Sequence, residues 1–346
     1  MIDIFTLFFA GITLLALCRR GNYIPRVSNT WTVLLVILAI AIIYWAPEGF
    51  DKLMYRGIYE SPGRFKKDAG WETYNAIYRF IIGSHTDLFF LVHDIFYTCG
   101  FVYFAYKTFP KEYVWYYLLI VFISMGYYSG GANVMRSGFA ISLIFYGLGG
   151  LTFSRKSLIR FGVFALIACT IHLSTAIIVG ALVVAYFYPK YKWYVGLWLL
   201  VLVLSYADVL GMISDYMVKL LGDNSKRLTF YMSSGEAAGL YRNAGFRFDF
   251  VIYSLIPIII GLIYLVKFRI DDRFYTIIFC NYILINAVWL VVIRIPFADR
   301  FALMSWVFIP LVTCYPALKC NMPMRRQYLA MAILLPVMLT MMYMLR

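Results

Sequence analysis

The sequence predicts an all-α polytopic membrane protein with about twelve transmembrane helices. Of its 346 residues, 63% are hydrophobic and only 14% are charged, which is far from the composition of soluble globular domains. Aromatic residues make up 19% of the chain, as helix bundles with aromatic belts at the membrane interfaces require. The apolar residues also gather in segments close to the length that crosses a bilayer as a helix.

Twelve apolar segments can be marked along the chain. The first has no positive n-region and no small-residue cleavage site, so we expect a retained helix there rather than a signal peptide. The expected helices lie at about 2–18, 30–46, 86–106, 112–129, 137–153, 158–171, 173–188, 193–210, 249–266, 274–293, 301–316 and 327–345.

The longest apolar run covers residues 158–188 and is interrupted by one histidine, His172. This run is considerably longer than the ~20 residues that span a bilayer as a helix. We expect the chain to turn back at His172, so that two short helices meet at one face of the membrane. Without that turn, the basic loops around Lys267–Arg273 and Lys319–Arg326 would face outward, against the positive-inside rule.

The short loops set the expected orientation. With both termini outside, six short loops become cytoplasmic, and each carries two or three basic residues. These residues are Arg19, Arg20 and Arg26; Lys107 and Lys111; Arg155, Lys156 and Arg160; Lys190 and Lys192; Lys267, Arg269 and Arg273; and Lys319, Arg325 and Arg326. The formal charge of +14 follows from these loops and a basic outer surface, so it does not indicate nucleic-acid binding.

Two long loops, about 47–85 and 211–248, remain outside, and each contains an amphipathic stretch. In the first loop, aromatic and apolar residues recur at helical spacing, which predicts a helix lying in the membrane interface. That stripe consists of Trp71, Tyr74, Tyr78 and Ile81. We expect the two loops to cover the outer leaflet as a lid. No repeat or soluble domain interrupts the pattern, so residues 1–346 are expected to form a single integral membrane domain.

Metal and disulfide sites are not expected. The six cysteines lie within the predicted helices or at their cytoplasmic ends, and none lies in a long loop. The chain has no CxxC motif and no Cys/His cluster, which argues against a structural metal. We therefore expect no metal and no cofactor.

A group of cationic side chains gathers at the outer face in this topology. Arginine clusters at a membrane usually bind an anion or a counter-charge, and a planar guanidinium suits a lipid pyrophosphate because it binds phosphate oxygens bidentately. The candidates are Arg136, Arg242, Arg247, Arg294 and Arg300.

Each arginine also has a structural explanation. Arg136 could be an interfacial snorkelling residue, although the neighbouring Gly130, Gly131 and Gly138 would let the backbone approach a ligand closely. Arg294 and Arg300 could anchor helix ends in the segment RIPFADR. A solvated basic loop is the simpler explanation for the other two.

His172 is the candidate general base, because a neutral imidazole can accept a proton near working pH. A structural role at the helix turn is the alternative. Asp68 and Glu72 could act as the base instead, although solvated positions on the polar face of the first lid helix explain them more simply. His85 and His93 are weaker candidates, at a helix mouth and within a helix.

Several motifs together resemble those of EpsG-type and Wzy-type polysaccharide polymerases. An Arg-led apolar helix, VMRSGFAISLIFYGLGGL, is followed by the basic turn RKSLIR and by a helix that ends in ACTIHLSTAIIV. The late DRFALMSWVFIPLV resembles the family's second Arg-led helix, and DAGWETY is a looser match to its first external loop. Arg136, His172 and Arg300 fall on the family's motif positions.

The resemblance implies a GT-C-like, metal-independent glycosyltransferase at the periplasmic face of a bacterial inner membrane. It would transfer a glycan from undecaprenyl pyrophosphate to the terminal hydroxyl of another lipid-linked repeat unit. Trp71 and Tyr74 complete the predicted substrate-binding residues. The expected partners are undecaprenyl-pyrophosphate-linked oligosaccharide and membrane lipids, with a chain-length regulator as a further candidate and no nucleic acid.

Two other function classes remain as alternatives. A transporter or flippase of lipid-linked oligosaccharides would also suit twelve helices, but it should show charges near the midplane and two related halves. A membrane acyltransferase that uses His172 would need a cytoplasmic acyl-donor path or a second catalytic motif, and neither is evident in the sequence.

Overall fold

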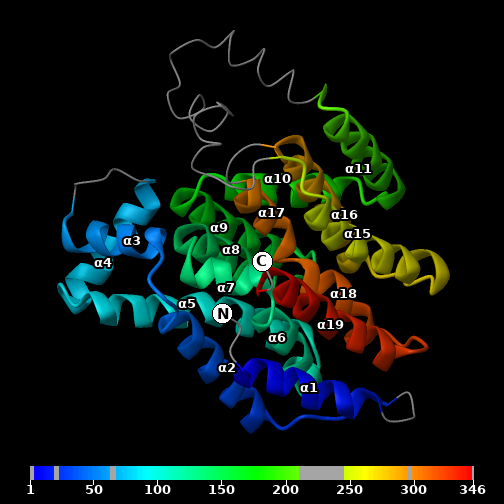
Figure 1. Cartoon of the computed structure of the whole chain (residues 1–346), viewed down its shortest axis with the longest axis horizontal. Coiled ribbons are helices and arrows are strands. Elements are labelled where there is room, and N and C mark those ends of the chain that lie inside the picture. Colours follow the sequence, from blue (N-terminus) through cyan, green and yellow to red (C-terminus); the bar gives the residue numbers. More distant parts are fainter. Residues whose placement is uncertain (1–3, 19–22, 63–67, 210–244, 295–297, 345–346) are drawn as a thin grey trace. The chain divides into compact units, whose positions relative to one another are not determined.

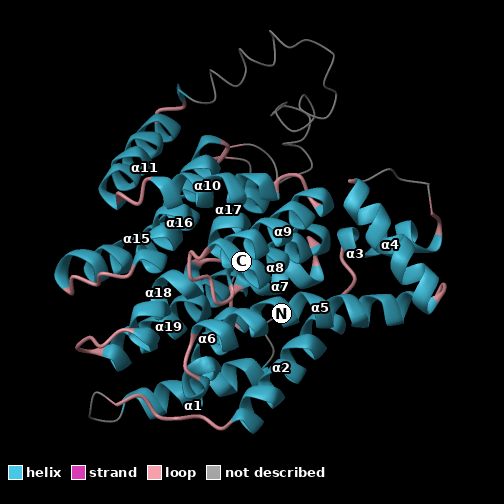
Figure 2. Cartoon of the chain, turned by 180° about the vertical axis from the view of Figure 1, so that it is seen from behind, coloured by secondary structure: helices cyan, strands magenta, loops and turns pink. Residues whose placement is uncertain are grey.

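The computed structural model describes residues 4–18, 23–62, 68–209, 245–294 and 298–344, and within these ranges the chain forms helices and no strands (Figures 1 and 2). Four of the described helices are long and apolar enough to cross a membrane, and several shorter ones are also apolar. The four are Thr86–Thr108, Phe248–Lys267, Arg273–Val291 and Ala298–Lys319. These findings confirm the predicted all-α structure for the described residues and support a multi-pass membrane protein.

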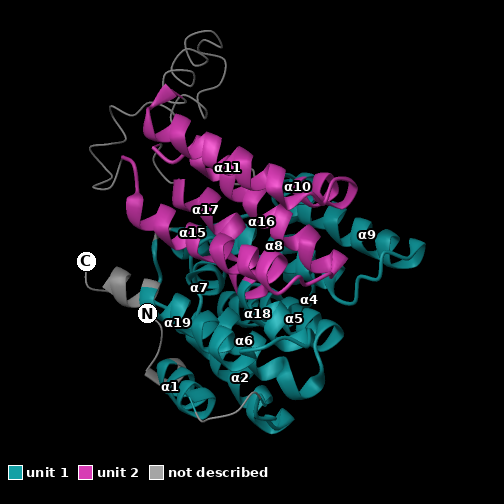
Figure 3. Ribbon diagram, turned by 90° about the vertical axis from the view of Figure 1, so that its right-hand side faces the viewer, with its two compact units in different colours: residues 1–180, 313–346 teal, residues 181–312 magenta. Residues whose placement is uncertain are grey.

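The chain divides into two compact units (Figure 3). Unit 1 comprises Met1–Gly180 and Thr313–Arg346, and unit 2 comprises Ala181–Val312. The helices of unit 1 are α1 (Ile4–Cys18), α2 (Asn29–Tyr44), α3 (Phe50–Glu60), α4 (Ala69–Ile82), α5 (Thr86–Thr108), η1 (Lys111–Tyr113), α6 (Val114–Phe122), α7 (Met125–Ala132), α8 (Met135–Leu148), α9 (Arg155–Ile171) and α19 (Arg325–Met344). Helices α10 (Thr175–Phe187) and α18 (Ile309–Lys319) contain the boundaries.

The centre of unit 1 is helix α8, which contacts α5, α7 and α9. Glycines make its closest approach possible: a Cβ on Gly138 would lie 2.1 Å from the backbone oxygen of Gly130 on α7. The glycines around Arg136 therefore serve helix packing in this structure. The space beside Gly138, where a ligand is expected from the sequence, is occupied by helix α7.

The predicted break at His172 is confirmed. Helix α9 ends at Ile171, and His172 adopts an extended backbone with φ −149° and ψ 105°. Its N–H donates to the Ala168 carbonyl at 2.9 Å, and its own carbonyl accepts from the Thr175 N–H at 3.0 Å. These bonds close α9 and begin α10, so His172 is held on both sides by the two helix ends.

One predicted helix, 112–129, is wrong as a single element. The chain breaks at Ser124, whose side-chain oxygen accepts from the Tyr127 N–H at 3.3 Å and caps α7. A serine at this position competes with the helical backbone and favours a new N-terminus. Apolar residues continue through the break, which is why hydropathy alone did not reveal it.

The first long loop folds into two helices, α3 and α4, and its predicted stripe is only partly exposed. Ile81 is 70% exposed, but Trp71 is fully buried against Tyr55 of α3 and His93 of α5. The expectation that the whole stripe lies in the membrane interface is therefore wrong at Trp71. Protein, rather than lipid, covers that end of α4.

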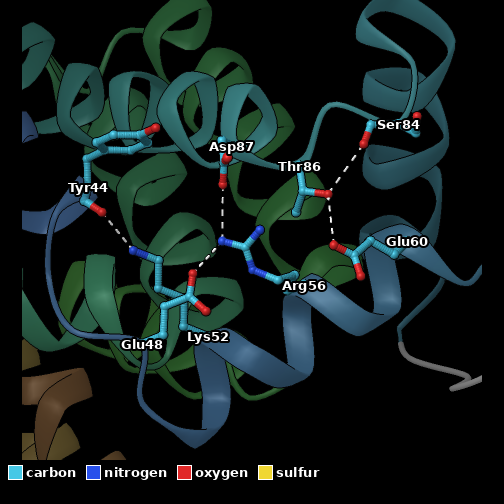
Figure 4. Close-up of polar contacts among 8 residues, drawn as sticks. All are labelled: Tyr44, Glu48, Lys52, Arg56, Glu60, Ser84, Thr86 and Asp87. Carbon is cyan, nitrogen blue, oxygen red and sulfur yellow. Dashed lines mark hydrogen bonds and ion pairs between the residues drawn. The ribbon is translucent and has the colours of Figure 1, made fainter.

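Polar contacts fasten α3 to its neighbours (Figure 4). Arg56 pairs with Glu48 and with Asp87, whose Oδ1 lies 3.1 Å from the guanidinium Nη2. Lys52 Nζ donates to the Tyr44 carbonyl at 2.8 Å, at the end of α2. Helix α3 is thus tied to both α2 and α5 by charged side chains.

Unit 2 is built on a buried polar network inside an apolar helix packing. Its helices are α11 (Tyr191–Tyr206), α15 (Phe248–Leu262), the π-helical turn η3 (Ile263–Lys267), α16 (Arg273–Val291) and α17 (Ala298–Trp306). The Asn286 amide accepts from Trp198 Nε1 at 2.8 Å and donates to Ser254 and Ser305 at 3.0 Å each. Such satisfied bonds hold apolar helices in one arrangement. Residues 210–244, which include most of the second long loop, lie outside the described residues.

Candidate functional site

Asp68, Arg136 and His172 meet at one point in unit 1, although they are far apart in the sequence. Asp68 Oδ2 lies 3.1 Å from Arg136 Nη1 and 3.6 Å from His172 Nδ1. Asp68 immediately precedes α4, Arg136 lies in the first turn of α8, and His172 ends α9. Three of the predicted site residues are therefore brought together by three different helix ends.

Local structure turns the Asp68 carboxylate away from its own helix. Asp68 occupies the N-cap position of α4, where its backbone carbonyl accepts from the N–H groups of Trp71 and Glu72 at 2.9 and 3.1 Å. Its side chain makes no capping hydrogen bond. An N-cap aspartate ordinarily uses its carboxylate on its own helix, but this one faces Arg136 and His172.

The three side chains are only partly hydrated. Arg136 and His172 are each 19% exposed at the side chain, and Asp68 is 35% exposed. Partial burial strengthens an ion pair relative to one in bulk water. The Nε of Arg136 is buried and has no hydrogen-bond partner among the described residues. Since a guanidinium carries five N–H donors, Arg136 keeps donor capacity beyond its pair with Asp68.

The contacts of Arg136 differ from those of three arginines that bind helix ends. Arg160, Arg294 and Arg325 each donate to backbone carbonyls at the ends of helices. Such bonds satisfy the carbonyls that a helix end leaves open. Arg136 instead faces a carboxylate that belongs to another helix. Helix capping does not explain this contact.

Aromatic side chains of α4 pack beside this group. The Tyr74 hydroxyl and His93 Nδ1 share a hydrogen bond of 2.9 Å, and the Tyr74 ring lies 4.8 Å from that of Phe139, one turn along α8 from Arg136. Burial raises the pKa of Tyr74 well above its ordinary value, so this hydroxyl stays protonated. Trp71 is fully buried, and a sugar could reach its ring only if α4 moved. Glu72 is exposed on the first turn of α4.

The remaining predicted residues belong to unit 2. Arg247 makes two bonds to the Asp249 carboxylate, at 3.0 and 2.8 Å, and lies 3.8 Å from the Phe250 ring centroid. Arg294 pairs with Asp208 at 3.0 Å. Arg300 is half-buried in α17.

Arg242 lies outside the described residues. Since each unit is described by itself, the gathering of all five arginines at one face stays a prediction.

Sequence reasoning missed two buried ionisable side chains in unit 1. Lys52 is 4% exposed and Asp94, within α5, is 1% exposed. Burial lowers the pKa of Lys52, and the attraction of Asp94 opposes that shift. An aspartate inside an apolar helix was the available signal, because such residues are costly in a membrane protein and need a partner.

Among the residues that the structure describes, no three His, Cys, Asp or Glu side chains are grouped as metal ligands. No curated protein and no solved structure matches the chain. The family model named EpsG matches residues 28–346, which is nearly the whole sequence, and confirms the resemblance seen in the motifs. The chain therefore belongs to the EpsG family, the family of Wzy-type polysaccharide polymerases.

Proposed function

We propose that the protein transfers a growing glycan from undecaprenyl pyrophosphate to the terminal hydroxyl of an incoming lipid-linked repeat unit. The reaction takes place at the periplasmic face of a bacterial inner membrane, in a GT-C-like bundle of about twelve spans, and needs no metal. The contact of Asp68 with both Arg136 and His172 supports this proposal most strongly. It joins a phosphate-binding side chain to a proton acceptor in a protein of a polymerase family.

Arg136 binds the donor pyrophosphate in this proposal. Its guanidinium carries donors beyond the Nη1 contact with Asp68, and its positive charge stabilises the negative charge that develops as the pyrophosphate leaves. An incoming phosphate competes with Asp68 for the same guanidinium. Arg300, on the second Arg-led helix, is the other predicted phosphate-binding residue, in unit 2.

His172 accepts the proton of the acceptor hydroxyl. Its Nδ1 faces the Asp68 carboxylate, which favours the tautomer with the proton on Nδ1 and leaves Nε2 as the basic atom. As the hydroxyl oxygen bonds to the anomeric carbon, its proton passes to Nε2. The bond from that carbon to the pyrophosphate oxygen breaks, and undecaprenyl pyrophosphate leaves with the electron pair. Asp68 then stabilises the imidazolium.

The proposed topology places Asp68, Arg136 and His172 in the periplasm. Single cysteines at positions 172 and 230, in a variant without the six native cysteines, should react with an impermeant thiol reagent in intact spheroplasts. Protection of both positions until lysis would show that the proposed orientation is wrong.

The decisive experiment incubates the purified protein with defined undecaprenyl-linked repeats. Wild type should give a ladder of polymers, while His172→Ala and His172→Gln should bind the repeats and make no long polymer. If Gln only had to replace a hydrogen bond at the helix turn, it would restore activity, and the role of base would pass to Asp68 or Glu72. Transport of the repeats across proteoliposomes without any ladder would favour the flippase alternative.

A further inference from the structure

Gly70 is the point where helix α4 touches the end of α9. A Cβ built on Gly70 would lie 2.5 Å from both the carbonyl carbon and Oγ1 of Thr170, and 2.7 Å from the backbone nitrogen of Ile171. Carbon atoms in packed proteins approach only to about 3.5–4.0 Å. Thr170 and Ile171 are the last residues of α9, directly before His172.

The crowded atoms at Gly70 have little freedom to move. Two of them belong to the backbone of α9, and the third, Thr170 Oγ1, donates to the Ile167 carbonyl at 2.7 Å. By contrast, a Cβ on Gly57 of α3 would meet no atom within 4 Å. A side chain therefore has no room at Gly70, whereas it has room at Gly57.

Asp68 lies two residues before Gly70, at the N-cap of the same helix. We propose that Gly70 is a positioning residue: its missing side chain lets the first turn of α4 rest on α9, and this brings Asp68 within reach of His172 and Arg136. The inference rests on the proposed function of these three residues. Relief of a 2.5 Å contact needs a shift of roughly 1 Å. Such a shift would lengthen the contacts of 3.1 and 3.6 Å beyond useful polar distances.

Other contacts should keep α4 attached when Gly70 is replaced. Trp71 is fully buried between α3 and α5, and Tyr74 bonds His93 and packs on Phe139. These contacts fix the helix to α5 and α8 independently of α9. Gly70→Ala should therefore fold with α4 in place but with its first turn displaced.

A cross-linking experiment measures that displacement directly. Asp68→Cys and His172→Cys are combined in a variant without native cysteines, and a short thiol-specific cross-linker is added to the membrane-embedded protein. Adding Gly70→Ala should slow cross-linking by about tenfold or more, whereas the matched control Gly57→Ala should leave the rate unchanged. An unchanged rate with Gly70→Ala would overturn the proposal. The cross-linking rate can be measured even if the wild-type protein makes no polymer. That lack of polymer would refute the proposed function but not the positioning role of Gly70.

Kinetics distinguish a positioning role from general damage. In the native sequence, Gly70→Ala should lower kcat by about 100-fold, since a misplacement of 1 Å can cost that much, with KM for the lipid-linked repeat within about twofold. In an Asp68→Asn background, Gly70→Ala should cause little further loss because it acts through Asp68. A full, multiplicative further loss would mean that Gly70 acts elsewhere.

Discussion

Arg136 in unit 1 and Arg294 in unit 2 look alike in sequence, but the structure uses them differently. Each lies near a helix end and pairs with an aspartate, at 3.1 and 3.0 Å. Arg294 also donates to the Ser205 and Tyr206 carbonyls, at 3.3 and 3.0 Å, so its charge closes the end of α11. Arg136 retains a buried Nε with no partner among the described residues. Arg294 therefore closes a helix end, whereas Arg136 contacts a carboxylate and, among the described residues, no helix-end carbonyl.

The largest expected effect is a loss of kcat on replacing Arg136, which replacing Arg294 should not cause. Arg136→Ala should lower kcat by a hundredfold or more, equivalent to about 2–4 kcal/mol, because it removes a charge that stabilises the leaving pyrophosphate. Arg136→Lys should rescue poorly, since an ammonium cannot bind phosphate bidentately. Product ladders from purified protein provide the measurement. Full activity of Arg136→Ala would reduce this residue to a membrane anchor.

The next largest effect concerns Lys52 and Asp94, two buried ionisable side chains of unit 1. Lys52→Met leaves Asp94 buried without its cation and should lower the free energy of unfolding by about 1–3 kcal/mol. Combining Lys52→Met with Asp94→Leu should recover most of that loss, because two apolar side chains leave no buried charge without a partner. Denaturation in detergent measures both variants. If the double variant is no more stable than Lys52→Met, the two charges are not coupled.

The same pair gives the protein a pH-dependent stability in the alkaline range. Burial lowers the pKa of Lys52 in the folded protein below its ordinary value of 10.5. At pH values between the folded-state pKa and 10.5, the unfolded chain therefore binds more protons than the folded protein. The free energy of unfolding should therefore rise with pH across this window, and the cost of burying the ammonium is fully present below it. Lys52→Met should flatten this part of the stability profile.

The smallest expected effect is a loss of stability on replacing Arg294. Arg294→Ala removes two hydrogen bonds to the end of α11 and should lower the free energy of unfolding by about 0.5–1.5 kcal/mol. Its kcat should stay within a few-fold of wild type. A hundredfold loss of kcat in a stably folded Arg294→Ala would place Arg294 with Arg136 in substrate binding.

Local sequence pattern predicted most helices but not how their ends meet. Hydropathy located the helices, and the single histidine in the long apolar run located the break between α9 and α10. Hydropathy did not reveal the break at Ser124, because apolar residues continue on both sides of it. Asp68 was identified as a candidate base, but its contacts with Arg136 and His172 join helix ends that are distant in the sequence. Packing between distant segments leaves no periodic pattern in the sequence.

The basic side chains that close helix ends in unit 1 link biogenesis to stability. Lys319 donates to the Thr108 carbonyl of α5, Arg325 to the Ala317 carbonyl of α18, and Arg326 to the Ala16 carbonyl of α1. Positive charges of this kind guide the orientation of nascent helices at the translocon. After insertion, these three side chains become part of the helix termini. A charge-swapped variant with compensating charges elsewhere would therefore insert correctly and still fray at the ends of three helices.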